Sequence, residues 1–294
     1  MTARRMLGRV VLYALAVALL IYILGPFLWL LSASFQTDIA LFQQPPEWFP
    51  DPFLTDNYRY VFTGKVPGEQ GIGAVAAFTQ EAQRIPRSLA NSLIVALAVL
   101  AVNLLLATVA AYTFARERFR GREVAFFFIL GSRLLPPVAV AIPIYQILRQ
   151  TALLDTKLGV ILVHSSFTLP FSIWVLTLYF RGMPREIEEA SLVDGASRLR
   201  ALFSIAIPLA APGLAAIAAF SFLFSYNEFL FALLLTQSPG SKTIPVAIAA
   251  IAQNPDASYS LIAVGVILAI IAPLILASVF RGYIARGLVT SLER

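Results

Sequence analysis

Long apolar stretches, separated by short polar segments, dominate the chain. Each stretch holds about 20 residues or more, so a helix rising about 1.5 Å per residue would cross a hydrocarbon layer about 30 Å thick. The pattern therefore predicts six membrane-spanning helices. They cover approximately Val10–Leu31, Ser92–Phe114, Val124–Leu148, Leu158–Phe180, Leu209–Leu235 and Leu261–Phe280.

The first of these stretches follows Arg4, Arg5 and Arg9, an arrangement that also occurs in secretory signal peptides. Its apolar run is longer than the roughly 7 to 15 residues of a signal peptide's hydrophobic region. We therefore expect a retained membrane span.

The composition agrees with an integral membrane protein. Of the 294 residues, 59% are hydrophobic and only 13% are charged, about half the charged share of an ordinary soluble domain. The chain has no cysteine, which excludes disulfides, a thiolate nucleophile and cysteine-ligated metals. We expect residues 1–294 to form a single transmembrane domain.

The formal net charge of +6 is compatible either with nucleic-acid binding or with the arginine excess of cytoplasmic loops. If the N-terminus is cytoplasmic, fourteen lysines and arginines fall in cytoplasmic segments and seven in outer segments, while Arg133 lies inside the third span. This bias predicts that both termini are cytoplasmic. It explains the basic charge by topology, and we expect no nucleic-acid partner.

Three polar segments connect the predicted spans. Residues 34–91 form a long outer segment whose prolines and glycines favour an irregular or partly helical cap. Residues 236–260 form a second outer loop. Residues 181–208 form a cytoplasmic loop by the parity of the spans.

Local signals in the cytoplasmic loop predict two short helices. Pro184 suits the first turn of one helix, and Gly195 is a typical end signal. Ser197 is expected to cap the second helix, which Pro208 and Pro212 would end at the membrane surface.

The second short helix is amphipathic. Its apolar residues recur at helical spacing, which places Leu199, Leu202, Phe203 and Ala206 on one face. Since a helix this short is marginal in isolation, that face must be covered. Its own bundle, the lipid interface and a partner protein are all compatible with the pattern.

Several motifs give the chain a family resemblance. The residues Glu189-Ala190-Ser191, Asp194-Gly195-Ala196, Phe203 and Ile207-Pro208 closely resemble the "EAA" loop of ABC importer permeases. The stretches "LLPPVAVAIPIYQIL" and "SYNEFLFALLL" are similar to the third and fifth spans of carbohydrate-importer permeases. The departures are small: Ser191 replaces an alanine, Ile-Pro-Leu replaces the usual order around the proline, and Tyr226 replaces a common tryptophan.

The resemblance implies the fold of a type I ABC importer permease, in particular the smaller permease subunit of maltose-type importers. This is an all-α membrane protein with six transmembrane helices, both termini in the cytoplasm and a coupling helix between helices 4 and 5. The coupling helix would enter a groove of a cytoplasmic ATPase. The residues that would form this contact are Glu188, Glu189, Ala190, Ser191, Asp194, Gly195, Ala196 and Phe203.

The same resemblance implies partners and a location. The partners are a second homologous permease, an ATPase dimer that binds ATP and Mg, and an extracellular or periplasmic solute-binding protein. The outer loop 236–260 would reach toward that binding protein, or else is a re-entrant or interfacial connection. The substrate would be a carbohydrate or related polyol, and the location a bacterial or archaeal cytoplasmic (inner) membrane. An ion-coupled secondary carrier, a membrane scaffold without a pathway and an importer for a non-sugar solute remain alternatives.

The chain offers no chemistry of its own for hydrolysis. The stretch "GSKT" at residues 240–243 lacks the earlier glycine of a phosphate-binding loop. His164 is the only histidine, so a metal site or catalytic dyad built on histidine is not expected, and a hydrogen-bonded structural role is favoured. We expect no catalytic residue, no metal and no cofactor bound to this chain.

Polar groups inside the spans are candidates for the transport pathway. Arg133 and Glu228 differ in predicted depth by roughly 15 Å, which argues for different partners. Pro136, Pro137 and Pro143 interrupt the third span, as happens where transporters form sites. Helix-to-helix hydrogen bonding is an equally good explanation of the polar groups. The pathway candidates are Arg133, Pro136, Pro137, Tyr226, Asn227 and Glu228, with Asn103 and Ser132 as possible contributors.

Overall fold

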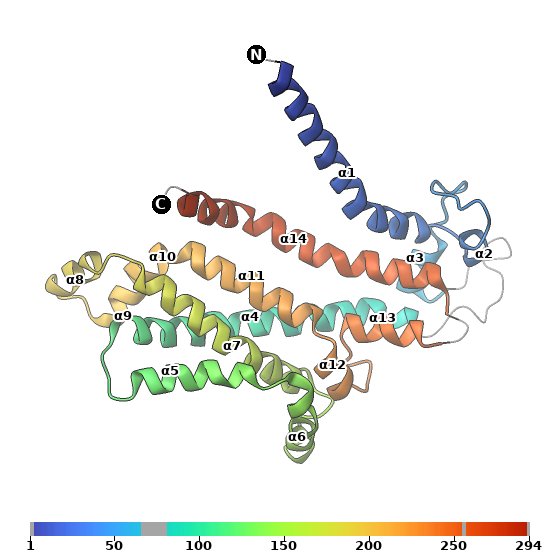
Figure 1. Ribbon diagram of the computed structural model, residues 1–294. Helices are drawn as coiled ribbons and strands as arrows, with labels where there is room; N and C mark the ends of the chain where they lie inside the picture. Colours follow the sequence, from blue (N-terminus) through green and yellow to red (C-terminus); the bar gives the residue numbers. More distant parts are fainter. Residues whose placement is uncertain (1–2, 66–80, 255–256, 293–294) are drawn as a thin grey trace. The chain divides into compact units, whose positions relative to one another are not determined.

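The computed structural model describes residues 3–65, 81–254 and 257–292, with side chains from residue 8 to residue 282 within these ranges. Every regular element in the described ranges is a helix (Figure 1), so the all-α prediction is confirmed. Residues 66–80, which belong to the predicted outer segment 34–91, lie outside the described residues. The chain divides into two compact units, one of residues 1–86 and 247–270 and one of residues 87–246 and 271–294.

The first unit is built around the segment between α1 (Ala3–Ala33) and α4 (Ile85–Arg116). Asn57 is buried, and its Nδ2 donates to the carbonyls of Ser34 at 3.0 Å and Gln36 at 2.9 Å. These bonds tie a short helix to the chain that follows the first span. For the described residues, the prediction of a partly helical cap is confirmed. The helices that lie wholly in this unit are α1 (Ala3–Ala33), α2 (Asp38–Leu41), α3 (Asp56–Thr63) and η2 (Ala82–Arg84).

Most helices lie in the second unit, and three others run from one unit into the other. Those wholly inside the second unit are α5 (Arg122–Gly131), η3 (Ser132–Leu134), α6 (Pro137–Gln150), α7 (Lys157–Arg181), α8 (Glu186–Val193), α9 (Arg198–Ala201), η4 (Leu202–Ala206), α10 (Ile207–Leu209), α11 (Ala211–Asn227) and α12 (Leu230–Leu235). Those shared between the units are α4 (Ile85–Arg116), α13 (Ile244–Ala252) and α14 (Tyr259–Leu292).

Four helical segments in the described residues are long and apolar enough to cross a membrane. Two bent helix pairs are also long and apolar enough when the two helices of each pair are taken together. The count is therefore four to six, depending on whether each bent pair is one span. Five of the six predicted stretches coincide with these elements. The predicted stretch Leu209–Leu235 overlaps only the Ala211–Asn227 half of the second bent pair and continues into α12. The four single segments are Gly8–Ala33, Ala82–Arg116, Lys157–Arg181 and Tyr259–Gly282.

The first bent pair is α5 with α6, which meet at 98° (Figure 1). Leu135 and Pro136 have extended backbone angles, with ψ of 120° and 132°, as expected for residues that precede a proline. Pro137 then begins α6, where its missing N–H costs no helical bond. The prediction that Pro143 also interrupts this span is wrong, because Pro143 lies inside α6.

The second bent pair consists of Arg198–Leu209 and Ala211–Asn227, which meet at 79°. The helical segment that contains the amphipathic helix ends at Leu209, between Pro208 and Pro212, as predicted. The π-helical turn η4 precedes Pro208, and Pro208 and Pro212 each lie in the first turn of a helix, α10 and α11. In a first turn the missing proline N–H has no helical partner to lose, so the chain continues and bends after Leu209.

The core of the second unit joins α4, α7, η4 and α11. Small residues on α4, including Ala107 and Ala111, allow the close packing that is common between membrane helices. Phe180 of α7 and Leu202 and Ala206 of η4 are buried against them. The segment after α9 is therefore held by the bundle itself.

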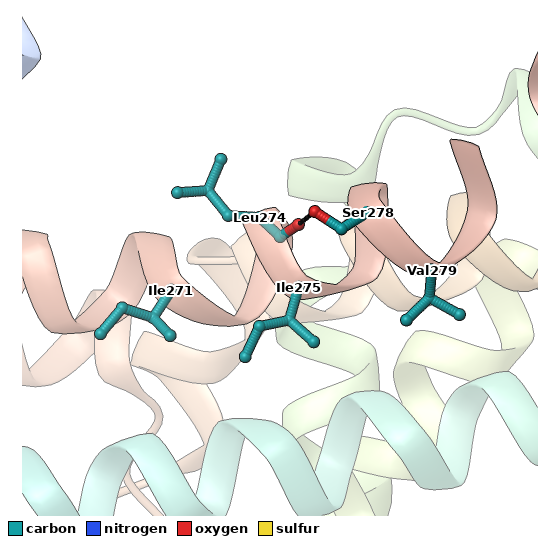
Figure 2. Close-up of a pocket in the computed structure, with 5 residues that line it drawn as sticks. All are labelled: Ile271, Leu274, Ile275, Ser278 and Val279. Atoms are coloured by element: carbon teal, nitrogen blue, oxygen red, sulfur yellow. Dashed lines mark hydrogen bonds between the residues drawn. The ribbon is translucent and has the colours of Figure 1, made fainter. Parts of the chain in front are cut away.

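One face of α14 remains open (Figure 2). An apolar groove of about 420 Å³ is lined by Ile271, Leu274, Ile275, Ser278 and Val279. The Ser278 hydroxyl donates to the Leu274 carbonyl at 2.8 Å, so the groove offers no free polar group from this side chain. Such a surface is compatible with contact with lipid chains or with another apolar helix.

Candidate functional site

The predicted coupling loop begins with α8. The way this helix ends explains why Asp194 and Gly195 follow it. The Ala196 N–H bonds to the Ser191 carbonyl at 3.0 Å, and the Gly195 N–H bonds to the Leu192 carbonyl at 3.1 Å. Gly195 has a φ of 86°, which glycine adopts without steric cost. This arrangement is a Schellman motif, and the prediction that Gly195 ends the helix is confirmed.

One face of α8 is open to the surroundings. Glu189 and Val193 lie four residues apart, so they share a face, and the Val193 side chain is 87% exposed. Ala190, Asp194 and Gly195 are exposed as well. The exposed end of α8 thus presents one acidic and one apolar side chain beside a tight turn.

The apolar face of the second helix is divided between two environments. The Ser197 hydroxyl accepts from the Arg200 N–H at 3.3 Å, which confirms the predicted cap. Leu202 and Ala206 are buried in the bundle, whereas Leu199 and Phe203 are 64% and 60% exposed. The bundle therefore covers half of this face, and the other half is open in the described structure.

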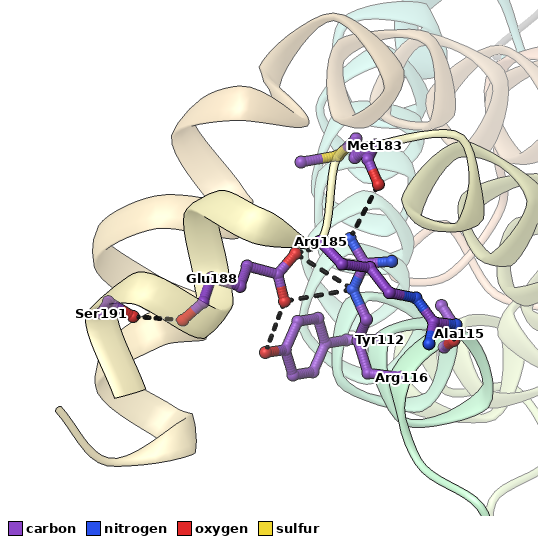
Figure 3. Close-up of polar contacts among 7 residues, drawn as sticks. All are labelled: Tyr112, Ala115, Arg116, Met183, Arg185, Glu188 and Ser191. Atoms are coloured by element: carbon purple, nitrogen blue, oxygen red, sulfur yellow. Dashed lines mark hydrogen bonds and ion pairs between the residues drawn. The ribbon is translucent and has the colours of Figure 1, made fainter. Parts of the chain in front are cut away.

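Glu188 differs from its neighbours because its side chain points into the protein (Figure 3). Arg116 of α4 donates to Glu188 Oε1 from Nη2 at 2.6 Å and from Nε at 3.0 Å. The Tyr112 hydroxyl donates to Oε2 at 3.0 Å. The two charged side chains are only 7% and 6% exposed. Among the predicted coupling residues, Glu188 thus holds α8 against α4 rather than facing outward.

The end of α4 holds the following helix in the same way. Glu117 pairs with Arg198 at the start of α9, and this ion pair is exposed. Arg116 thus pairs with Glu188 of α8, and the next residue, Glu117, pairs with Arg198 of α9. The coupling loop is attached to the end of α4 at two points.

Glu228 lies where α11 ends and α12 begins. Its Oε1 accepts from the Phe231 N–H at 2.9 Å, and its Oε2 accepts from the Ala232 N–H at 3.0 Å. The first N–H groups of a helix have no acceptor within the helix, and this carboxylate supplies acceptors for two of them. The break after Asn227 is thus stabilised by the residue that follows it.

His164 completes this cluster. Its two ring nitrogens lie 3.0 Å from Glu228 Oε2 and 2.8 Å from Ser225 Oγ. A tautomer with hydrogen on Nε2 donates to the carboxylate and accepts from the serine hydroxyl. The prediction of a hydrogen-bonded structural histidine is confirmed.

Arg133 is not paired with Glu228, as the predicted difference in depth indicates. It is exposed, its Nη1 donates to the Phe167 carbonyl at 2.6 Å, and its guanidinium lies 5.5 Å from the centre of the Phe171 ring. Pro136 and Pro137 are exposed at the bend beside it. These three residues lie together where α5 and α6 meet.

The remaining polar pathway candidates differ in accessibility. Tyr226 is buried and stacks on Phe222 with ring centres 5.4 Å apart. Asn227 is exposed, and its Nδ2 donates to the Leu223 carbonyl at 3.0 Å. Asn103 is buried, donates to Thr168 and accepts from Ser172, so it joins α4 to α7. Ser132 is exposed at the bend.

Asp155, between α6 and α7, organises the loop after α12. Its Oδ1 accepts from the N–H groups of Gln237 at 2.7 Å and Ser238 at 2.9 Å and from the Ser241 hydroxyl. Burial raises the pKa of this carboxyl, but the hydrogen bonds outweigh burial and lower the pKa from its ordinary value of 3.8 to about 2. Asp155 is therefore ionised at neutral pH and holds the loop as a charged acceptor.

Two residues at the start of α4 contact the same loop. Asn91 Nδ2 donates to the carbonyls of Pro239 at 3.2 Å and Lys242 at 3.0 Å. The Ser92 hydroxyl accepts from the Ile244 N–H at 2.8 Å. The α4 helix thus contacts the coupling loop at one end and the loop 237–244 at the other.

Comparison with known proteins identifies the family. Residues 103–290, more than half of the chain, match the family described as "Binding-protein-dependent transport system inner membrane component". The chain belongs to this family. Membership confirms the resemblance seen in the coupling-loop and span motifs, and makes the chain a multi-pass membrane protein of transport rather than an enzyme.

Curated relatives of this permease extend over nearly its whole length. The trehalose transport system permease protein of Mycobacterium tuberculosis is 31% identical, over 98% of this chain and 97% of the relative. The trehalose/maltose transport system permease protein of Thermococcus litoralis is 29% identical, over 96% and 95%. The permease also resembles a solved bacterial ABC transporter involved in the import of the acidic polysaccharide alginate, with a TM-score of 0.77, 21% identity and coverage of 97% and 99%. The last likeness confirms the fold.

Sequence reasoning missed the contacts on the permease's second span. Arg116 and Asn91 carry no motif, and they resemble ordinary polar residues at the two ends of an apolar stretch. The three glutamates at the start of α8 were a visible signal, but a sequence does not tell which of them faces inward. Asp155 likewise acts through residues more than 80 positions away.

Proposed function

We propose that the chain is one of two membrane-spanning subunits of an ATP-driven importer for a carbohydrate or related polyol. The relatives named for trehalose and trehalose/maltose transport support this class of substrate. We place the protein in a bacterial or archaeal cytoplasmic membrane with six spans and both termini in the cytoplasm. The excess of arginine in the segments around residues 1–9, 116–122 and 181–200 supports this orientation.

The single observation that carries the proposal is the exposed end of α8. Glu189 and Val193 project from a short helix that is closed by a tight turn at Gly195, while the opposite side of α8 is fastened through Glu188. A cytoplasmic ATPase dimer, which binds ATP and Mg, would receive this end. Its closure would displace α8 and change which side of the pathway is open.

Two further partners follow from the proposed class. A second, homologous permease would pair with this chain across the membrane, and a solute-binding protein would deliver the substrate at the outer side. The loop 237–244, held by Asp155 and Asn91, would lie on the side of that binding protein. Arg133, Pro136, Pro137, Tyr226, Asn227 and Glu228 are the proposed residues at or beside the pathway.

The test is a charge reversal at the exposed end of α8. Glu189→Lys should leave the chain inserted, because Glu189 is exposed and makes no side-chain bond in the described residues. Like-charge contact at an interface costs several kcal/mol, so the ATPase that co-purifies should fall about tenfold or more, and solute uptake should stop. Glu123→Lys, an exposed glutamate on the same predicted side, is the matched control. Normal uptake and unchanged ATPase recovery in Glu189→Lys would contradict the proposal.

A further inference from the structure

The contacts at the two ends of α4 suggest a role that goes beyond docking of α8. At one end, the inner contact consists of Arg116 and Tyr112 with Glu188 of the coupling loop. At the other end, the outer contact consists of Asn91 and Ser92 with the loop 237–244. Asn91 and Arg116 are 25 residues apart, which is ~38 Å along a helix. A single helix thus connects two loops on opposite sides of the membrane.

The α4 helix is well suited to act as a rigid connection. From residue 87 to residue 116 it contains neither glycine nor proline, the two residues that most often bend helices. By contrast, α1, α7 and α14 each contain a proline inside the helix. The α5–α6 and α10–α11 segments are sharply bent. A displacement applied at one end of α4 is therefore passed to the other end with little loss to bending.

The inner contact has the form of a positioning contact. An arginine that approaches a carboxylate with two nitrogens fixes the direction as well as the distance of its partner. A buried ion pair is often no more stabilising than an apolar pair of similar size, so its value here lies in holding α8 at a defined place on α4. Arg185 adds a bond to the Ala115 carbonyl at 3.4 Å, and Arg116 adds one to the Met183 carbonyl, also at 3.4 Å.

The outer contact is also built from buried, specific bonds. Asn91 and Ser92 are buried, and together they satisfy two carbonyls and one N–H of the facing loop. Lys157 donates both to Asn91 Oδ1 at 3.3 Å and to the Gly240 carbonyl at 3.2 Å. A displacement of α4 therefore moves the backbone of this loop directly.

We propose that α4 transmits the state of the outer loop 237–244 to the coupling helix α8, so that docking of the solute-binding protein stimulates the ATPase through Asn91 at one end and Arg116 at the other. Both are positioning residues that contact neither substrate nor ATP. This inference rests on the proposed function, since it requires an ATPase at α8 and a binding protein at the loop.

The test measures ATP hydrolysis by the complete purified importer in lipid nanodiscs, with and without its solute-binding protein. Arg116→Gln and Asn91→Ala should each reduce the stimulation by the binding protein, expressed relative to the basal rate of the same variant, about fivefold or more. The double variant should be no worse than either single variant, because the two ends act through one connection. Arg118→Gln and Gln150→Ala, exposed positions on the same two predicted sides, are the controls.

Two results would overturn the inference. One is wild-type stimulation in either single variant, and the other is a double variant whose loss is the product of the two single losses. If Arg116→Gln does not assemble, the exchanged pair Arg116→Glu with Glu188→Arg replaces it and should retain stimulation. Failure of the proposed function looks different, since the wild-type complex would then recover no ATPase or show no stimulation.

A second measurement leaves both contacts intact. The chain has no native cysteine, so spin labels attached at Val109→Cys on α4 and Val193→Cys on α8 report a single distance. That distance should be the same in the nucleotide-free and ATP-bound importer, because α8 moves together with α4. A change in that distance between the two states would overturn the inference.

Discussion

At the scale of single residues, acidic side chains satisfy backbone N–H groups where helices break. Glu228 accepts from two N–H groups in the first turn of α12. Asp155 accepts from two N–H groups of the loop that follows α12. Glu188 differs, since it takes its partners from the arginine and tyrosine side chains of α4. In a membrane protein such carboxylates give polar backbone an acceptor that lipid does not offer.

The lowered pKa of Asp155 leads to a prediction about pH. Its folded pKa of about 2 lies below the ordinary value of 3.8, so the folded state binds fewer protons than the unfolded state between these values. The stabilisation is therefore complete above about pH 4 and is lost as the pH falls through 2. Amide hydrogen exchange in residues 236–243, corrected for the intrinsic rate, should show constant protection between pH 5 and 7.

The variant Asp155→Asn separates charge from shape at this position. Hydrogen bonds to a charged acceptor contribute about 1.5 to 3 kcal/mol, so exchange in residues 236–243 should be about tenfold faster or more at every pH from 5 to 7. Exchange in α8 serves as an internal reference. Unchanged protection of the loop in Asp155→Asn would contradict the assigned role of the carboxylate.

At the scale of elements, the prolines determine where spans bend, but their position within each helix decides the effect. Pro136 and Pro137 stand between α5 and α6 and produce a 98° bend. Pro143 and Pro170 lie inside helices that continue past them. Pro208 is the second residue of α10, the helical turn that follows η4. The residue type alone does not distinguish these cases.

The turn at Gly195 gives a prediction for the coupling helix. Its φ of 86° is left-handed, and a Cβ added there would meet no atom within 4 Å, so the cost of Gly195→Ala is backbone strain of about 1 to 2 kcal/mol. The end of α8 should loosen, with amide exchange across residues 190–197 about five- to thirtyfold faster. Gly195→Asn should have a smaller effect, because asparagine tolerates this conformation.

A matched control for this prediction lies at the other end of the loop. Gly182 ends α7 with a φ of −77°, which any residue adopts, and an added Cβ there makes only ordinary contacts. Gly182→Ala should leave exchange in residues 190–197 unchanged. Equal effects at the two glycines would show that the Schellman motif does not hold the end of α8.

At the scale of the whole molecule, the distribution of arginine predicts which ends of the spans face the cytoplasm. Because the chain lacks cysteine, single cysteines introduced at exposed positions report this orientation directly. Arg118→Cys should react with a membrane-impermeant maleimide only after the cells are opened, and Gln237→Cys should react in intact cells. The reverse pattern would refute the proposed orientation. Both positions are exposed in the described structure, so labelling requires no unfolding.

The sequence by itself determined the class of the protein and much of the coupling loop. Apolar length is a local property, so four predicted spans coincide with long helical segments and a fifth coincides with the bent pair of α5 and α6. Caps and end signals are local as well, which is why Ser197 and Gly195 were correctly interpreted. The motif at Glu189 to Pro208 correctly indicated the family.

Only the tertiary structure decided which polar groups meet. The pairing of Arg116 with Glu188 joins residues 72 positions apart, and Asn91 with Lys242 joins residues 151 positions apart. Such contacts depend on how helices are rotated and packed, and hydropathy records neither property. The sequence likewise left Glu228 open between a pathway role and hydrogen bonding, and packing brought His164 to it. The direction that a side chain faces is set by its neighbours in space, and these are known only once the chain has folded.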